Sequence, residues 1–267
     1  CIASYDNHHA KQVINSIKNN KHVFVEKPIC TNYSEYKKIK SELKKKPHLK
    51  ISSNLVLRTS PQFLKLSNMI KNRKFGKIYM ISGEYNYGRL SKITNGWRGK
   101  LKNYSVTHGG AIHIIDLVIS FINKKPKLVY AMGNNISTKG TIFKNNDLTN
   151  SSIKFENNLI FNITSNFGCV MPHHHTLKIY GTKLSFVQEF NSAKIYSSRL
   201  SNNPKILFNK NYLNKDKKKV LESFICSLAT NQKKKSLVTT NEVLNSMAIS
   251  LTIDKSIKTK KYEKINY

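Results

Sequence analysis

The chain is 267 residues long, enough for one large domain or two ordinary ones, and its aromatic fraction of 10% argues against disorder. Its formal net charge is +32, but the lysines are scattered and their densest runs lack interleaved aromatic residues. A lysine-rich surface accounts for this pattern better than a specific nucleic-acid site, and anion binding remains an alternative.

The first segment alternates between strand and helix patterns. Ala10, Val13 and Ile17 recur at helical spacing, and Val23–Val25 is a compact apolar run. In chain order we expect a strand at Cys1–Ser4, a helix at His8–Asn20, a strand at Val23–Val25, a helix at Thr31–Lys46 capped by Ser34, and a strand at Leu49–Leu57. Short connections between such elements predict a parallel sheet covered by helices.

The rest of the chain changes character after Gly76. We expect a helix from Pro61 to about Asn72, a long strand at Lys77–Tyr87, an apolar helix at Gly110–Ile122, strands at Leu128–Met132, Asn150–Phe155, Leu159–Phe167, Thr176–Tyr180 and Lys183–Gln188, and helices at Val220–Ala229 and Thr240–Thr259. Asn157-Asn158 indicates a tight hairpin between two of these strands. The pattern predicts an α+β unit with a largely antiparallel sheet over residues 75–267, after an α/β unit over residues 1–74.

Cysteine usage and hydropathy indicate the compartment. The four cysteines are far apart and form no CxxC pair, which is typical of free thiols in a reducing compartment. No apolar run approaches the roughly 18 residues of a membrane span. We therefore expect a cytoplasmic protein with no membrane partner.

The first candidate site is Glu26-Lys27-Pro28, which directly follows a strand. Ligands of open α/β sheets bind beyond the carboxyl ends of the strands. A lysine there can hold a substrate hydroxyl, and it can share in proton transfer when burial lowers its pKa. The alternative interpretation is an ordinary surface turn.

The second candidate is the pair His113 and Asp116 on the apolar helix that Gly109-Gly110 opens. The two side chains are three residues apart and share a helix face. An imidazole beside a carboxylate is a plausible general base. The alternative is a core histidine with a structural carboxylate.

Two further segments carry polar and aromatic groups. Trp97-Arg98 lies in a loop, where it is suited either to stack on a polar ligand and donate hydrogen bonds to it, or to anchor the loop. His173-His174-His175 looks like a metal site, but strand neighbours point to opposite faces and no carboxylate or thiol is near in sequence. We predict no metal and assign a substrate contact to His174.

These motifs, in this order, resemble the family of glucose–fructose oxidoreductase and inositol dehydrogenase (Gfo/Idh/MocA). The resemblance covers nearly the whole chain. Its carriers are Ile2–His9, which is similar to I-A-T-P-N-x-x-H; Lys21–Pro28, similar to G-K-H-V-x-x-E-K-P; Asn54 and Arg58 before Pro61; Phe75–Ile78; Gly109-Gly110 with His113 and Asp116; Leu177–Lys183; and Leu237–Lys260.

The resemblance implies a Rossmann domain followed by an α+β domain with a large open sheet. It implies hydride transfer between NAD or NADP and a sugar, nucleotide sugar or cyclitol. Lys27 and His113 are then the catalytic residues. Ser4, Asn7, His8, Glu26, Lys27 and Pro28 are expected to bind the cofactor, and Trp97, Arg98, Asp116 and His174 the substrate. A homo-oligomer formed through the open sheet is also expected.

The chain departs from the family pattern in two ways. The glycine fingerprint G-x-G-x-x-G is absent, and the chain opens without an initiator methionine, so we expect a fragment that begins inside the Rossmann domain. Many family members also carry an aspartate four residues before the helix histidine, where this chain has Gly109. His108 and Tyr104 are near enough in sequence to replace it.

These departures leave two alternatives to an enzyme. One is a non-catalytic binding or scaffold protein on the same fold, suggested by Gly109 and the absent fingerprint. The other is an anion-binding role, with nucleic acid included, suggested by the charge; it predicts steeply salt-dependent binding.

Overall fold

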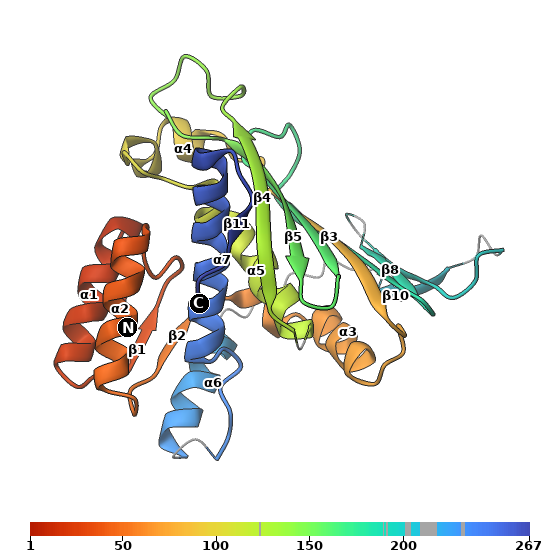
Figure 1. Ribbon diagram of the computed structural model, residues 1–267, viewed down its shortest axis with the longest axis horizontal. Coiled ribbons are helices and arrows are strands. Elements are labelled where there is room, and N and C mark those ends of the chain that lie inside the picture. Colours follow the sequence, from red (N-terminus) through yellow and green to blue (C-terminus); the bar gives the residue numbers. More distant parts are fainter. Residues whose placement is uncertain (123, 189, 191, 201–203, 209–217, 231–232) are drawn as a thin grey trace.

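A computed structural model describes residues 1–122, 124–188, 190, 192–200, 204–208, 218–230 and 233–267. Its first unit consists of α1 (Asp6–Lys18), β1 (Val23–Val25), α2 (Tyr33–Lys45) and β2 (Ile51–Ser53). β1 and β2 are parallel, and Ile2 forms a parallel bridge with Val25 on the other side of β1. The predicted parallel sheet is confirmed, with α1 and α2 packed side by side against it (Figure 1).

Local chemistry sets the ends of these helices. α1 buries Ala10, Val13 and Ile17, the residues whose spacing predicts it. The predicted cap of α2 is wrong: Asn32, not Ser34, accepts a hydrogen bond from the backbone N–H of Glu35 at 3.0 Å. Ser34 already lies inside the helix, because the chain is extended at Asn32.

The strand predicted at Leu49–Leu57 is shorter than expected. β2 ends at Ser53, and the chain then forms the 3₁₀ turn η1 (Val56–Thr59) and the helix α3 (Pro61–Lys71). Leu57 and Arg58 are neighbours and both are buried, which a half-exposed strand does not allow. Pro61 begins α3, where its missing N–H costs nothing.

The second unit is a nine-stranded sheet in the order β10-β9-β8-β7-β3-β6-β5-β4-β11. Its strands are β3 (Ile78–Asn86), β4 (Pro126–Asn134), β5 (Leu148–Phe155), β6 (Ile160–Asn166), β7 (His174–Gly181), β8 (Ser185–Gln188), β9 (Ala193–Tyr196), β10 (Lys205–Phe208) and β11 (Glu263–Lys264). Among these described strands β3 and β6 pair in parallel, and the other pairs are antiparallel. The predicted, mostly antiparallel sheet is confirmed, as is the hairpin at Asn158, whose φ is 62°.

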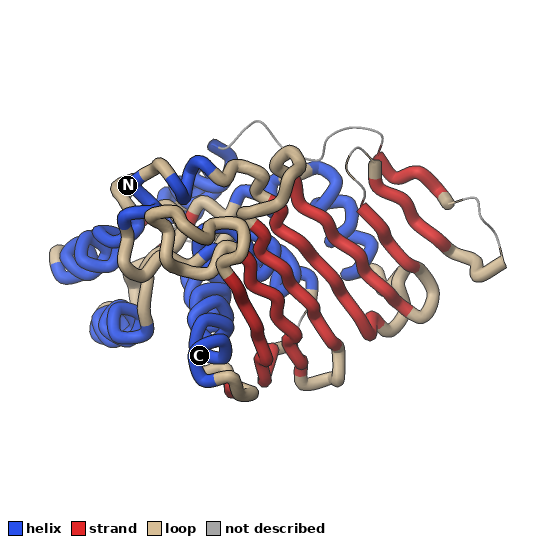
Figure 2. The backbone as a smooth tube through the Cα atoms, turned by 90° about the horizontal axis from the view of Figure 1, so that it is seen from above, coloured by secondary structure: helices blue, strands red, loops and turns tan. Residues whose placement is uncertain are grey.

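One face of this sheet carries helices and the other is open (Figure 2). Alternate residues of β5 are buried and exposed, as a one-sided sheet requires. α5 (Ile112–Phe121) and α7 (Thr240–Thr259) cover the buried face. At Gly83 of β3 a Cβ would lie 2.6 Å from Ile114, so α5 approaches the sheet closely there because the strand has no side chain. α6 (Lys218–Ala229) packs near β2 and η1.

α7 joins the two units. Its capping box uses Thr239 and Glu242, and Thr240 exchanges hydrogen bonds with the backbone of Ile51 in β2, at 2.9 and 3.1 Å. The Ser52 hydroxyl donates to Val238 at 2.9 Å. The same helix packs on β4 of the large sheet, so the parallel sheet is held at a set position beside it. In the described part of the chain, no helix is both long and apolar enough to cross a membrane.

Candidate active site

Lys27 follows β1 and reaches the second unit. Its Nζ donates to the carbonyl of Gly109, a residue 82 positions away in the chain. His9 lies beneath this turn and is fully buried, with its ring nitrogens 2.7 Å from the Pro28 carbonyl and 3.0 Å from the Ser4 carbonyl. His9 therefore connects the ends of two neighbouring strands, a role that the sequence analysis did not assign.

Asp6 is a second residue that the sequence analysis missed. It begins α1 and is buried, and burial raises the pKa of its carboxyl, against the positive charges of Lys27 and Arg98. Burial in turn lowers the pKa of Lys27, while the Asp6 charge acts in the opposite direction. The only sequence signal was its position just after the first strand, where ligands of α/β sheets bind.

The loop after β3 brings the predicted pair Trp97 and Arg98 to this cluster. Trp97 opens the 3₁₀ turn η2 (Trp97–Lys100) and stacks on Tyr5, with ring centroids 4.5 Å apart. The Arg98 guanidinium lies 4.5 Å from the Trp97 ring centroid, and its charge acts on Asp6 and Lys27. The stacked rings hold the loop over the start of α1, so Arg98 is placed beside Lys27.

Gly109 and Gly110 lie in η3 (Thr107–Ala111), a π-helical turn that leads into α5. A Cβ at position 109 would overlap the Tyr104 hydroxyl, and one at position 110 would overlap the Tyr85 ring. Two tyrosine rings therefore approach the backbone where side chains would otherwise stand. Tyr104 occupies the space of the side chain that position 109 lacks.

The Tyr104 hydroxyl is enclosed in an unusual way. The residue is 5% exposed, and its oxygen has no hydrogen-bond partner among the described residues. Burial raises the pKa of the phenol, so it remains protonated and is a hydrogen-bond donor. Arg98 and Asp6 are the charged groups that act on it most strongly. A buried donor without an acceptor is costly, and such groups often mark functional sites.

His113 is one helical turn after Gly109 and lies at the edge of the same cluster. The residue is 9% exposed, and its ring is stacked over Tyr85 with centroids 6.3 Å apart. Lys27 therefore contacts the turn of helix that precedes His113. The two residues that the sequence analysis assigned to catalysis are therefore linked through the Gly109 backbone.

The histidine triplet divides between two sides of β7. His173 and His175 lie on the same side, with ring centroids 5.1 Å apart, and His173 is adjacent to Tyr85 and Tyr87. Burial and the Arg89 charge lower the pKa of His173 to about 4, so its ring is neutral and its Nδ1 donates to the Asn86 carbonyl. The charge of Lys27 also acts on it.

His174 does not face this cluster. Its Nδ1 lies 2.9 Å from the Pro172 carbonyl, and its ring packs on Phe190 at 5.1 Å. His174, the predicted substrate contact, thus lies on the other side from His173 and His175, because alternation along the strand turns these neighbours to opposite sides. Among the described residues, no group of three or more His, Cys, Asp and Glu side chains is placed to hold a metal ion.

Asp116 also has a different role from the predicted one. Its carboxylate is 1% exposed and accepts two hydrogen bonds of 2.7 Å from Arg58 and one of 3.2 Å from Ser246. Arg58 additionally donates to Glu242 at 2.7 Å. Asp116 is thus a structural carboxylate that connects η1, α5 and α7, and it is not available to a substrate.

The predicted cofactor residues lie at the carboxyl ends of the Ile2 strand and β1. Ser4 donates to Gln12 at 2.7 Å, Asn7 and His8 are exposed at the start of α1, and Glu26 accepts from Asn54 at 2.8 Å. Hydroxyl, amide and imidazole groups at this edge fit the hydroxyl and amide groups of a nicotinamide riboside. His9, rather than His8, is the histidine buried in this turn.

Two family models match the chain. The one described as "Oxidoreductase family, NAD-binding Rossmann fold" matches residues 1–53, and the one described as "GFO/IDH/MocA C-terminal domain" matches residues 63–187. Lys27 lies within the first match, and Arg98, Tyr104 and His113 lie within the second. No curated protein sequence matches the chain.

Solved structures with the same fold include three dehydrogenases. A levoglucosan dehydrogenase in complex with NADH and L-sorbose has a TM-score of 0.82 at 17% identity, over 99% of this chain and 78% of that chain. A myo-inositol 2-dehydrogenase from Lactobacillus plantarum has 0.78 at 15%, over 99% and 79%. A scyllo-inositol dehydrogenase from Lactobacillus casei, with bound NAD(H) and scyllo-inositol, has 0.76 at 17%, over 98% and 78%. The likeness confirms the predicted fold.

Proposed function

This chain belongs to the Gfo/Idh/MocA family of NAD-binding oxidoreductases, and from that premise we propose that it transfers a hydride between NAD or NADP and a hydroxyl- or carbonyl-bearing carbon of a sugar, nucleotide sugar or cyclitol. The contact between Lys27 and the Gly109 carbonyl, one turn before His113, carries this proposal. It joins a lysine at the end of a Rossmann strand to the helical turn of the second unit from which His113 follows.

Each residue of the cluster has a proposed task. Lys27, whose pKa burial lowers, holds the substrate oxygen and shares in its proton transfer. His113 accepts the hydroxyl proton during oxidation and returns it during reduction. Ser4, Asn7, His8, Glu26 and Pro28 line the cofactor side. When bound, the nicotinamide supplies the carbon that accepts or gives the hydride.

The substrate class follows from the groups around Lys27. The Arg98 guanidinium can donate hydrogen bonds, and the neutral ring of His173, whose Nδ1 donates to the Asn86 carbonyl, can accept one at Nε2. Such a mixture suits a compact molecule with several hydroxyls, because each hydroxyl both donates and accepts. The three dehydrogenases of the same fold, whose substrates are a sugar derivative and inositols, favour the same class.

The proposal is tested by turnover of the purified protein with NAD and NADP against inositols and aldoses. We expect Lys27→Met and His113→Asn each to lower kcat/KM by about 10²–10⁴-fold on the best substrate. Lys21→Met, at an exposed lysine outside the cluster, is the matched control. Unchanged turnover in both active-site variants contradicts the assigned roles.

A scaffold protein on the same fold remains the second candidate, because Gly109 stands where many family members carry an aspartate. Tyr104 provides a polar group in that space, which favours an enzyme. Binding of NADH without turnover of any polyhydroxylated substrate, together with undiminished NADH binding in Lys27→Met, favours the scaffold.

The open face of the large sheet is the proposed homo-oligomer interface. Met132 and Ile160 are exposed large side chains on strands β4 and β6 of this sheet. Light scattering of wild type and Met132→Lys tests the interface, and identical masses contradict it.

We also propose that the protein is cytoplasmic, since its four cysteines are free thiols.

A further inference from the structure

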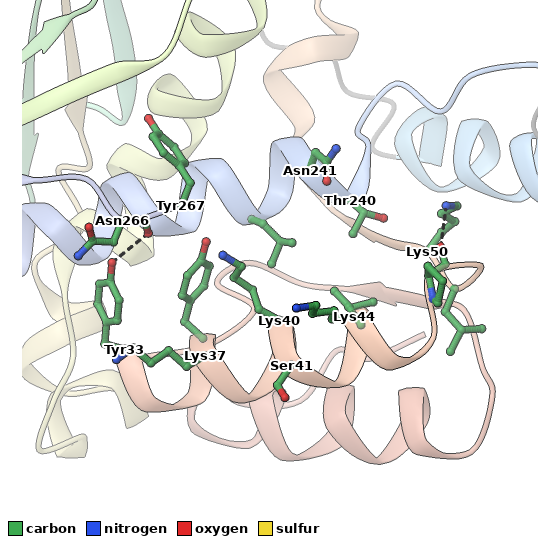
Figure 3. A pocket seen from close by; sticks show the side chains of 15 residues that line it. Tyr33, Lys37, Lys40, Ser41, Lys44, Lys50, Thr240, Asn241, Asn266 and Tyr267 are labelled. Atoms are coloured by element: carbon green, nitrogen blue, oxygen red, sulfur yellow. Dashed lines mark hydrogen bonds between the residues drawn. The ribbon is translucent and has the colours of Figure 1, made fainter.

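A lysine-rich groove lies away from the catalytic cluster, between α2, the start of α7 and the segment at Asn266 and Tyr267. Its volume is about 660 Å³, which is within the range of small-molecule sites. α2 forms one wall, and the start of α7 and the segment at Asn266 and Tyr267 form the other (Figure 3). Neither Lys27 nor His113 lines it.

The lysines of this groove follow one face of α2. Lys37, Lys40 and Lys44 are spaced by three and four residues, so they project along one stripe of the helix. Lys50, just before β2, extends the row. Figure 3 shows the α2 lysines on the groove side of the helix.

These four positive charges are not neutralised within the described protein. No Asp or Glu side chain is among the lining residues, and none of the four lysines has an ion-pair partner among the residues that the structure describes. Lys45, on another side of the same helix, contrasts with them because it pairs with Glu42 at 2.7 Å. The groove is thus a concentration of uncompensated charge, which attracts anions.

One end of the groove is suited to phosphate. Lys44 and Lys50 lie there beside Thr240 and Asn241, the first two residues of the twenty-residue helix α7 (Figure 3). The N-terminus of a helix carries partial positive charge, and at α7 the capping box of Thr239 and Glu242 already pairs part of its backbone N–H groups. Lysines and a helix N-terminus at one place add their attraction for an anion.

The other end is aromatic. Tyr33, Tyr36 and Tyr267 line it, and the Tyr33 hydroxyl donates to the Asn266 carbonyl at 3.0 Å. Lys37 lies 5.9 Å from the Tyr33 ring centroid and Lys40 5.6 Å from that of Tyr36, so the charged stripe continues over the rings. Leucines form the remaining apolar floor. Tyr36 is buried, so the partly exposed Tyr33 and Tyr267 are the rings that suit this end to a planar ring system.

We propose that the groove binds a nucleoside polyphosphate, with the phosphates at Lys44, Lys50 and the start of α7 and the base at the tyrosines. The site is separate from the dehydrogenase site, and it does not rest on the proposed function. Its lysines would bind the ligand through charge-assisted hydrogen bonds.

The test is calorimetric titration of ATP into the whole protein at physiological salt, with excess NADH present to occupy the cofactor site. Lys37→Gln with Lys44→Gln removes two groove charges. Lys38→Gln with Lys45→Gln removes two charges from the same helix outside the groove. Thermal unfolding of both pairs checks that each variant is folded, and Lys50→Gln serves as a second groove variant.

We expect the groove pair to weaken ATP binding at least about tenfold and the control pair to change it less than twofold. Adenosine should bind much more weakly than ATP, and tripolyphosphate should bind less tightly than ATP. Equal losses in both pairs show a general effect of net charge and overturn the site. Equal affinity for tripolyphosphate and ATP overturns the assignment of the tyrosine end, and no binding of ATP overturns the whole proposal.

Discussion

The Tyr104 hydroxyl lies in the volume that a side chain at Gly109 would fill. Gly109 is also the residue whose carbonyl accepts a hydrogen bond from Lys27, and it precedes His113 by one helical turn. The absence of a side chain at this position is therefore coupled to the presence of a buried phenol. Activity and stability are expected to respond differently when the two residues are changed.

Tyr104→Phe removes only the hydroxyl. Because that oxygen has no partner among the described residues, its loss should leave the free energy of unfolding unchanged within about 1 kcal/mol or raise it. We expect kcat to fall by about tenfold or more, since the donor beside the Lys27 contact is lost. Urea unfolding and steady-state kinetics measure the two effects. A loss of stability with unchanged kcat would assign Tyr104 to packing alone.

Gly109→Ala reverses a general rule. Alanine in place of a helical glycine usually stabilises a protein by about 1 kcal/mol. Here the new methyl group collides with Tyr104, and we expect a loss of about 1–3 kcal/mol. In a Tyr104→Ala background the collision is absent and the same change should be neutral or stabilising. A double-mutant cycle by urea unfolding measures the coupling, and additive effects contradict the packing.

Asp6→Asn changes the pH dependence of the reaction. The Asp6 carboxylate opposes the effect of burial on Lys27 and raises the pKa of its ammonium group. Its removal lowers the pKa of Lys27 further, so the limb of the kcat/KM profile that reports Lys27 moves to lower pH. Glu42→Gln, at an exposed pair with Lys45, serves as the control and should not shift the profile. A shift to higher pH in Asp6→Asn falsifies the arrangement.

His173 and His174 are adjacent in sequence but should differ in function. We expect His173→Ala to raise KM about tenfold or more. The neutral His173 ring lies beside Tyr85, and burial and, to a smaller extent, the charge of Lys27 lower its pKa. His174→Ala should change KM less than twofold, since its ring packs on Phe190. Substrate saturation curves for the two variants decide the matter. A larger increase in KM for His174→Ala than for His173→Ala would support the sequence-based prediction that His174 contacts the substrate.

Asp116→Ala tests the structural role of the Arg58 ion pair. Arg58 is left buried with one fewer carboxylate, and we expect a loss of about 3–5 kcal/mol in the free energy of unfolding. The double variant Arg58→Leu with Asp116→Leu should lower the free energy of unfolding less than Asp116→Ala does, since it leaves neither charge of this ion pair buried. KM of the folded fraction should not change. A raised KM with normal stability would return Asp116 to the substrate site.

Residue patterns predicted most of the helices and strands. Burial of one face of a helix or strand spaces its apolar residues regularly, and this spacing can be recognised in the local sequence. α7 has the predicted bounds, Thr240–Thr259, and β1 has the predicted bounds, Val23–Val25. β9, β10 and β11 were missed. The family itself was recognised from the order of short motifs.

The composition of the site was only partly predictable. Lys27 and His113 stand in motifs, so their resemblance to the family identified them. Asp6, His9 and Tyr104 stand in no motif that specifies their role, and His174 and Asp116 were assigned by adjacency. Sequence spacing indicates which residues share a face of one element, but not which face meets another element.

The sequence by itself determined the order of elements, the family and the two catalytic candidates. Only the tertiary structure decided that the Gly109 backbone meets Lys27 across 82 residues, that Tyr104 fills the space beside it, and that Asp116 belongs to Arg58. The physical reason is that α7 holds the parallel sheet beside the large one. Contacts across that junction depend on how the two units pack against each other. The apolar periodicity of each unit predicts its own helices and strands, but it does not predict this packing.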